Sequence, residues 1–245
     1  AMQVLRLQPN NSEQQTVLSW YVDSPQACKA EADAFGNTVH RLYLENTEAY
    51  FKIEARGVVD TRNGPWQQNT GLSPLVFLRA STSTQMDQNL WQLLEPYAAM
   101  LQSNLESGVQ ALSAEILFRV PFTLGVSHAH TSASQALANA GGVCQDHAHI
   151  LIACCRAMGV PARYVSGYLY SPEHTPPQEA GHAWAQVWHP EKGWLGVDVT
   201  NQCLVNDCYV QLAIGLDYYD ACPIRGVRIG KGDETMSVKV WVEAL

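Results

Sequence analysis

The sequence has no long apolar run and little charge of either sign. None of its windows approaches the about 18 consecutive apolar residues that a membrane-spanning helix needs. Charged residues make up 16% of the 245 residues, and acidic ones outnumber basic ones by 23 to 15. The net charge of −8 argues against a basic surface for nucleic acid. With 47% hydrophobic residues, the chain has enough apolar surface for a folded core.

The sequence also lacks an export signal. Residues 2–9 are too polar for a secretory signal peptide, and Ala1 before Met2 is typical of a cloning remnant. The cysteine count is odd, which fits free thiols in a reducing compartment. We therefore expect a cytoplasmic protein that does not associate with a membrane. The seven cysteines are Cys28, Cys144, Cys154, Cys155, Cys203, Cys208 and Cys222.

The sequence has few patterns that are typical of metal-binding sites. The chain has no calcium loop of the Asp-x-Asp-x-Asp-Gly type. One alternative is a metal site that uses Cys144 and His147 together with His128 or His130. Because no close pair of ligands lies elsewhere, we expect neither a metal nor a cofactor.

The start of the chain has the pattern of a small β domain. Its strand-like segments are residues 16–22, 37–44 and 49–55. Turn-forming residues at 60–65 then mark a boundary. We predict an N-terminal β domain over residues 1–62 and a larger core over residues 63–245.

The larger region changes from helical to strand periodicity. Leucines recur at helical spacing within residues 87–118, where Pro96 should divide the helix. The helix that begins at Cys144 is apolar around most of its circumference and stops at Gly159, so we expect it to be buried. Helices followed by strands predict an α+β fold with an antiparallel sheet. The later predicted strands are residues 163–170, 182–188, 193–199, 209–215 and 237–242.

Three side chains form a candidate active site. Cys144 stands at a helix start, where unpaired backbone N–H groups and the helix dipole favour a thiolate. His182 begins a predicted strand, and Asp198 lies on the next strand across a turn, within the about 5 Å that separates adjacent strands. The carboxylate can then orient the imidazole toward the thiol. Strand alternation points His182 away from the face of small residues, so the strand must twist to bring it to the site.

The predicted chemistry is acyl transfer through a thioester. His182 takes the proton of Cys144, the thiolate attacks a carboxamide or peptide carbonyl, and His182 returns the proton to the leaving amine. The backbone N–H of Cys144 is the natural first donor to the oxyanion, and Gln135 and Asn139 are weak candidates for the second. Water or a second amine resolves the thioester.

Four segments carry a more specific pattern. They are residues 142–149 (GVCQDHAH), 162–168 (ARYVSGY), 182–184 (HAW) and 193–201 (GWLGVDVTN). Together they resemble the bacterial transglutaminase-like proteins, which are often described as candidate cysteine proteases. The β-rich start and residues 215–226 resemble the N-terminal domain and the C-terminal signature of that family. The resemblance implies a papain-like core and places the family's triad on Cys144, His182 and Asp198.

The chain departs from the family pattern in three places. His147 stands where the family usually has an aromatic residue, and Val199 stands where proline is usual. The N-terminal domain begins late, without the first strand of the family. A missing strand leaves a sheet edge that needs a partner, so we expect a homo-oligomer through the N-terminal β domain.

Four further residues are candidates for a substrate cleft. His147 lies three residues after Cys144, so the two can share a helix face. Trp184 is the best candidate for a substrate wall. Asp217 and Tyr218 are expected to fix a loop near the site.

Three functions follow from these residues. The first is a thiol-dependent hydrolase that acts on an amide or peptide bond of a peptide or protein. The second is a transglutaminase, in which an amine resolves the same thioester. The third is a non-catalytic binding or scaffold domain, against which the intact Cys144, His182 and Asp198 argue.

Overall fold

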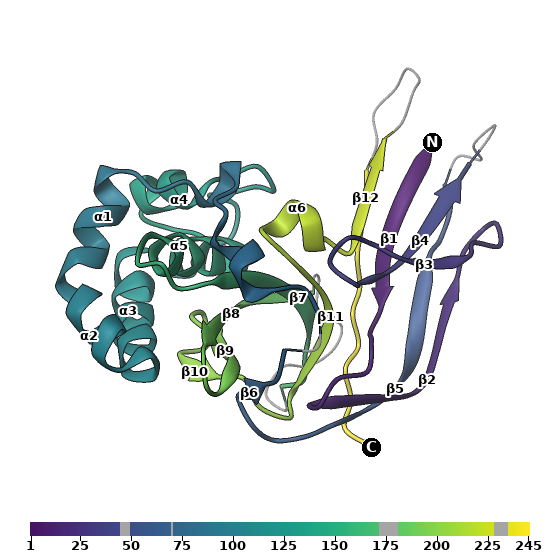
Figure 1. Ribbon diagram of the computed structural model, residues 1–245. Helices are drawn as coiled ribbons and strands as arrows, with labels where there is room; N and C mark the ends of the chain where they lie inside the picture. The colour runs from purple at the N-terminus through teal and green to yellow at the C-terminus, as the bar shows by residue number, and fades with distance from the viewer. Residues whose placement is uncertain (45–49, 70, 172–180, 228–234) are drawn as a thin grey trace.

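The fold is organised around one buried helix and one antiparallel sheet. The computed structural model describes residues 1–44, 50–69, 71–171, 181–227 and 235–245. Helix α5 (Cys144–Ala157) packs against the central sheet, mainly against its strands β8 and β7. In Figure 1 the helices of residues 88–157 lie on one side of this sheet and the N-terminal strands lie on the other. The predicted α+β fold is confirmed.

The central sheet has the order β10–β9–β8–β7–β11, and β6 pairs with β9. Its strands are β6 (Trp66–Gln67), β7 (Ala162–Leu169), β8 (His182–His189), β9 (Gly193–Asp198), β10 (Cys203–Leu204) and β11 (Tyr209–Gly215). All of these pairs are antiparallel. On β8 the small residues Ala183 and Ala185 belong to the core cluster that contains α5, while Trp184 packs in a second cluster. The alternation of this strand thus fits a close approach of the helix.

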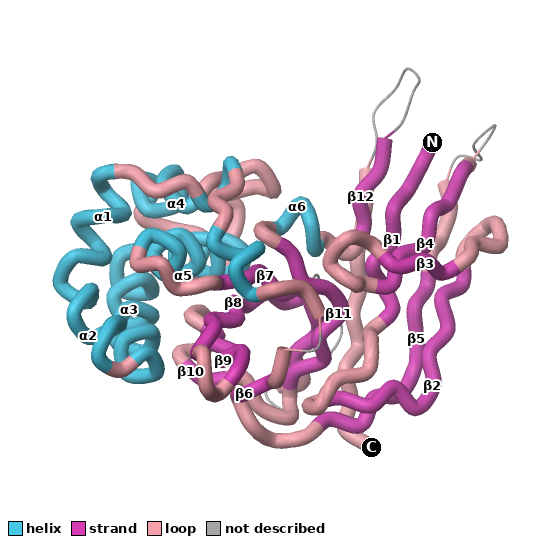
Figure 2. Tube along the Cα trace, viewed as in Figure 1, coloured by secondary structure: helices cyan, strands magenta, loops and turns pink. Residues whose placement is uncertain are grey.

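The helical layer covers one face of the central sheet (Figure 2). Its members are α5 together with α1 (Gln88–Leu94), α2 (Ala98–Ser103), α3 (Leu105–Arg119) and α4 (Ala133–Asn139). The other helical elements are the short helix α6 (Tyr218–Ala221) and the 3-10 turns η1 (Pro74–Leu78), η2 (Thr82–Thr84) and η3 (Glu95–Tyr97). Pro96 sits in η3 and divides α1 from α2, as predicted. In α5, every residue from Asp146 to Arg156 is buried, which confirms the predicted central helix. No helix of the described residues is long and apolar enough to cross a membrane.

The N-terminal strands form two small sheets. Their members are β1 (Met2–Gln8), β2 (Gln15–Asp23), β3 (Ala30–Ala32), β4 (Thr38–Tyr43) and β5 (Glu54–Thr61), joined by β12 (Ile224–Val227). The order of the first sheet is β12–β1–β4–β3, and β2 pairs with β5. Strand β1 lies outside the segments predicted as strands, and β12 brings the end of the larger region back to it. The edges of this sheet are therefore β3 and β12, and oligomerisation through the sheet stays a prediction.

Residues 237–242 do not form the strand that their alternation predicts. They carry no strand assignment beyond a single bridge residue, and most of their side chains are exposed. A strand needs a neighbouring backbone with free hydrogen-bonding groups, and alternation along one segment does not supply it.

Two side-chain amides cap the outer edge of β11, the last strand of the central sheet. Gln15 donates to the carbonyl of Gln211 at 2.9 Å and accepts from its N–H at 2.8 Å. Asn37 makes the same pair of contacts with Ile214, both at 2.8 Å. Both amides are buried, at 3% exposure. They satisfy backbone groups that an unpaired edge strand would leave open, and so tie the N-terminal strands to the central sheet.

We expect replacement of either amide to weaken the fold. Gln15→Ala or Asn37→Ala leaves one N–H and one C=O of β11 buried without a partner, which costs about 1–3 kcal/mol per group. Urea denaturation measures the change in the free energy of unfolding. Gln26→Ala is the matched control, because Gln26 is exposed. Equal stability of the Gln15 and Gln26 variants would contradict the role given to the cap.

Candidate functional site

Cys144 is the first residue of α5. The residue before it, Val143, is extended, and its N–H donates to Asp146 Oδ2 at 2.8 Å, which fixes the first turn of the helix. Gly142 is required here because a Cβ atom on it would lie 2.8 Å from the side chain of Asp146. The sulfur is therefore held at a helix N-terminus, where partial positive charge favours an anion.

His182 is the first residue of β8 and lies at the end of the sheet. It pairs with Gly167 at the last position of the β7–β8 ladder, and its side chain is 12% exposed. The ring hydrogen-bonds both to Asp198, through Nε2 at 2.6 Å, and to the side chain of Cys144. Because Nε2 is used by Asp198, Nδ1 is the nitrogen left for the sulfur. The strand end thus resolves the difficulty that alternation raised for His182.

Asp198 is the last residue of β9 and is fully buried. Four hydrogen bonds reach its carboxylate. Oδ2 accepts from His182 Nε2, from Tyr209 Oη at 2.7 Å and from Asn201 Nδ2 at 2.7 Å. Oδ1 accepts from the backbone N–H of Asn201 at 3.1 Å. This full set of donors is what a buried carboxylate needs in order to stay ionised.

The contacts of His182 and Asp198 favour the charged pair. Burial opposes a charged imidazole, but the hydrogen bonds and the attraction from Asp198 and Cys144 outweigh it and raise the pKa of His182 to about 10. Burial likewise opposes the carboxylate, yet the contacts with His182, Asn201 and Tyr209 keep the pKa of Asp198 below its ordinary value. At neutral pH the pair is therefore an imidazolium and a carboxylate.

His147 does not line a cleft, unlike the expectation from the sequence. It is fully buried. Its Nε2 lies 2.7 Å from the carbonyl of Val120 and must donate to it, while Nδ1 lies 2.8 Å from Thr200 Oγ1. Burial lowers the pKa of His147, so the ring is neutral. It joins α5 to the end of α3 and to the turn after β9.

Trp184 is not a substrate wall in this structure either. It is 2% exposed, and its ring stacks beside that of His182, with centroids 6.2 Å apart and an interplanar angle of 29°. Tyr209 contacts Trp184 edge-on at 5.2 Å. Gly167 leaves the space, since a Cβ there would lie 2.5 Å from the indole. Trp184 thus packs beside the ring of His182 and limits its movement.

Asp217 and Tyr218 fix the short helix α6 against α5. Asp217 caps the helix by accepting from the N–H of Tyr219 at 2.9 Å. The N–H of Tyr218 donates to His149 Nε2 at 3.1 Å. Burial lowers the pKa of His149 to about 4, so this nitrogen is free to accept. Whether these residues contact substrate stays a prediction.

Two residues of the site were not predicted from the sequence. Asn201 lies in the same motif as Asp198, three residues after it, and this spacing fits a turn that returns to the carboxylate. Tyr209 comes from β11, and nothing in its local sequence distinguishes it from a core tyrosine. Of the weak candidates for a second oxyanion donor, Asn139 donates its side-chain N–H to Val126 O, whereas Gln135 only accepts, from Ser132 N through its side-chain oxygen. A role for either in stabilising the oxyanion stays a prediction.

The other thiols differ from Cys144 in their surroundings. Cys154 and Cys155 are buried in the core, and burial raises the pKa of both, that of Cys155 to about 12. Burial also raises the pKa of Cys203, Cys208 and Cys222. Among the described residues, no group of three or more His, Cys, Asp or Glu side chains is arranged to hold a metal ion.

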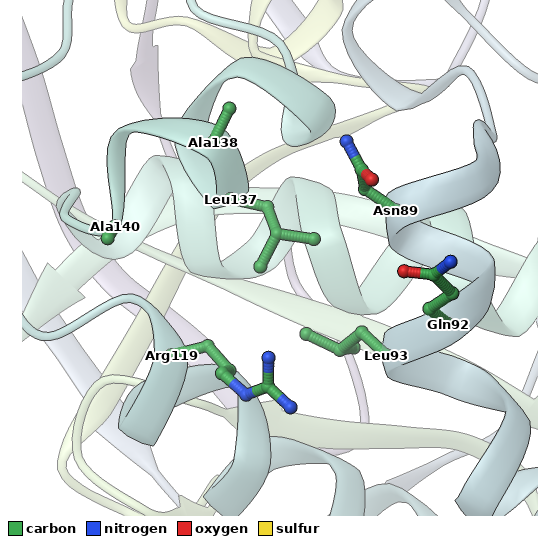
Figure 3. A pocket seen from close by; sticks show the side chains of 7 residues that line it. All are labelled: Asn89, Gln92, Leu93, Arg119, Leu137, Ala138 and Ala140. Atoms are coloured by element: carbon green, nitrogen blue, oxygen red, sulfur yellow. The ribbon is translucent and has the colours of Figure 1, made fainter.

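A separate pocket of about 360 Å³ lies between α1, the end of α3 and α4 (Figure 3). It is lined by Asn89, Gln92, Leu93, Arg119, Leu137, Ala138 and Ala140. None of these residues belongs to the group around Cys144. Arg119 is paired there with Glu115 at 2.9 Å, and it stands at the C-terminal end of α3, where the helix dipole favours a positive charge. These two contacts account for an arginine at this position, so it does not indicate a bound anion.

Two family descriptions match separate parts of the chain. Residues 1–60 match the bacterial transglutaminase-like N-terminal region. Residues 92–199, which include Cys144, His182 and Asp198, match the transglutaminase-like superfamily.

Relatives of similar length come from mycobacteria. An uncharacterized protein of Mycobacterium leprae is 27% identical over 265 residues, covering 98% of this chain and 91% of the relative. One from Mycobacterium tuberculosis is 29% identical over 269 residues, with coverages of 98% and 85%. A shorter match joins 25% of this chain to 10% of a protein-glutamine gamma-glutamyltransferase of Pseudomonas aeruginosa, at 41% identity over 68 residues.

A solved structure shares the fold over the whole chain. It is a candidate cysteine protease from Cytophaga hutchinsonii, with a TM-score of 0.73 and 23% sequence identity. The similarity covers 100% of this chain and 86% of that one. At this identity the comparison supports the fold, including the N-terminal strands.

The charged state of His182 predicts a pH-dependent stability. Its pKa rises from an ordinary 6.5 to about 10 on folding. The charged pair therefore contributes its full stability below about pH 6.5 and loses it as the pH rises through about 10. We expect the difference in unfolding free energy between the unchanged chain and His182→Ala to shrink between about pH 6 and pH 10. A difference that stays constant in urea denaturation over this range would contradict the assignment.

Proposed function

We propose that this chain, which matches the transglutaminase-like superfamily over residues 92–199 and the bacterial transglutaminase-like N-terminal region over residues 1–60, is an enzyme that hydrolyses amide or peptide bonds. Cys144 is the proposed nucleophile, His182 the acid and base, and Asp198 the group that orients the imidazole. The observation that carries the proposal is the charged pair of His182 and Asp198, hydrogen-bonded to the side chain of Cys144. The acyl donor is a carboxamide or a peptide.

Attack begins from a charged sulfur. An imidazolium beside Cys144 and the N-terminus of α5 both favour the thiolate over the thiol. The thiolate adds to the carbonyl carbon, and the carbonyl oxygen becomes an oxyanion. The backbone N–H of Cys144, at the first position of α5, is suited to stabilise that oxygen.

The bond to nitrogen breaks in the next step. His182 gives its proton to the departing nitrogen, the C–N bond cleaves, and the acyl group stays on sulfur as a thioester. Water then attacks the thioester, and the now neutral His182 takes the proton of that water. The carboxylic acid leaves and the thiolate–imidazolium pair is restored.

Transfer to an amine is the second candidate function. An amine that reaches the thioester in place of water gives a new amide through the same three residues. The match of 68 residues to the Pseudomonas aeruginosa protein-glutamine gamma-glutamyltransferase favours this candidate. The match covers only 10% of that protein, so the candidate rests on a short segment. Hydrolysis needs only water, and we place it first.

An activated Cys144 should react with electrophiles before the other thiols. We expect iodoacetamide to label Cys144 faster than the other six cysteines between about pH 6 and pH 7, because Cys144 has an imidazolium partner in His182. Peptide mapping by mass spectrometry measures the rates. His182→Ala should remove the preference, whereas His128→Ala, at an exposed histidine, should keep it. Equal labelling of all accessible thiols in the unchanged chain would argue for a scaffold.

The thioester itself tests hydrolysis against transfer. Incubation with peptide and carboxamide libraries should add an acyl mass to Cys144, and Cys144→Ala should lose the adduct while it keeps the stability of the fold. Cys208→Ala is the matched control, because Cys208 is a partly buried thiol outside the site. Added primary amines should leave the products unchanged if water is the acceptor. Amide products formed with those amines would support transfer instead.

A further inference from the structure

The carboxylate of Asp198 receives more support than its pairing with the imidazole explains. Oδ2 accepts three hydrogen bonds, and only the one from His182 takes part in the proposed reaction. Asn201 is a sequence neighbour that also bonds to Oδ1. Tyr209 is different, because it reaches the same oxygen from β11, and strands β8 and β7 lie between β11 and β9 in the sheet.

The hydroxyl of Tyr209 is held where it can serve only as a donor to Asp198. The side chain is 6% exposed, and its ring lies edge-on against Trp184. Burial, followed by the charge of Asp198, raises the pKa of Tyr209 well above its ordinary value, so the hydroxyl keeps its proton. An ionised carboxylate only accepts, and therefore the O–H points at Oδ2.

A thiol lies behind the hydroxyl. Cys203 Sγ is 3.2 Å from Tyr209 Oη. Since the O–H is given to Asp198, the S–H donates to the tyrosine oxygen, and burial raises the pKa of Cys203, which keeps that proton in place. Cys203 thus donates to Tyr209, and Tyr209 donates to Asp198, whose Oδ2 also accepts from the imidazole of His182.

We propose that Tyr209 is a positioning residue for the reaction, whose hydroxyl holds the carboxylate of Asp198 in the orientation that presents Oδ2 to His182. The inference rests on the proposed function of Cys144. Two physical effects carry it. A donor with a fixed ring stops rotation of the carboxylate, and a hydrogen bond to the charged form keeps Asp198 ionised at lower pH.

The variant that isolates the hydroxyl is Tyr209→Phe. Loss of one hydrogen bond to a charged group should reduce the rate of Cys144 alkylation by iodoacetamide about tenfold near pH 6. Fewer donors also raise the pKa of Asp198, so the acid limb of the pH–rate profile should move to higher pH. Tyr168→Phe is the matched control. It removes a hydroxyl from β7, in a half-buried ring that stacks on Trp20 and has no described bond to Asp198.

Two measurements separate positioning from packing. In an Asp198→Asn background, Tyr209→Phe should have little further effect on the alkylation rate, because the two residues act in series. A packing role would give the same loss in both backgrounds. Carbon-13 NMR of labelled aspartate side chains measures the titration of Asp198 directly, and Tyr209→Phe should shift it upward while Tyr168→Phe leaves it in place.

The outcomes distinguish this inference from the proposed function. Slower alkylation and a shifted Asp198 titration, in a chain that cleaves no amide, would support Tyr209 and reject the hydrolase. Amide cleavage with an unchanged pH profile and an unchanged Asp198 titration in Tyr209→Phe would reject Tyr209 and keep the hydrolase. An effect of Tyr209→Phe that equals that of Tyr168→Phe would likewise overturn the inference.

Discussion

The contact between His182 and Asp198 sets the conditions that the centre of this fold has to meet. A carboxylate with 0% exposure stays charged only if donors surround it, and the ends of β8, β9 and β11 meet so that His182, Asn201 and Tyr209 supply them. The same convergence places the imidazole beside the sulfur at the start of α5. The order of the strands, the positions of their ends and the start of α5 therefore together bring the carboxylate, the imidazole and the sulfur into contact.

The three residues nearest the proposed chemistry were predicted from the sequence because each lies in a local motif. Cys144 marks a helix start, His182 opens a strand and Asp198 ends the next strand, so spacing along the chain reflects spacing in the fold. Residue roles that depend on distant segments were not readable in this way. His147 was placed in a cleft, but its ring is bound by Val120 and Thr200.

The same limit applies to the strands. Pattern alone located the longer strands of the central sheet, β7, β8, β9 and β11, but not the two-residue strands β6 and β10, and it placed Pro96 at a helix break. It missed β1 and predicted a strand at 237–242, since pairing depends on which backbone lies alongside. Tyr209 was missed for a related reason. Its partner Asp198 lies on β9, which is separated from β11 by two other strands in the sheet. A tyrosine in a buried strand has no local sequence feature that reveals such a polar contact.

Gln15 and Asn37 occupy the place that another strand would take beside β11. Anyone who transplants the central sheet into a different protein must therefore carry these amides along or provide a substitute for them. Without them, the open N–H and C=O groups would recruit β11 of a neighbouring molecule, and copies would add edge to edge. The N-terminal strands thus block the β11 edge of the central sheet against pairing with a further strand.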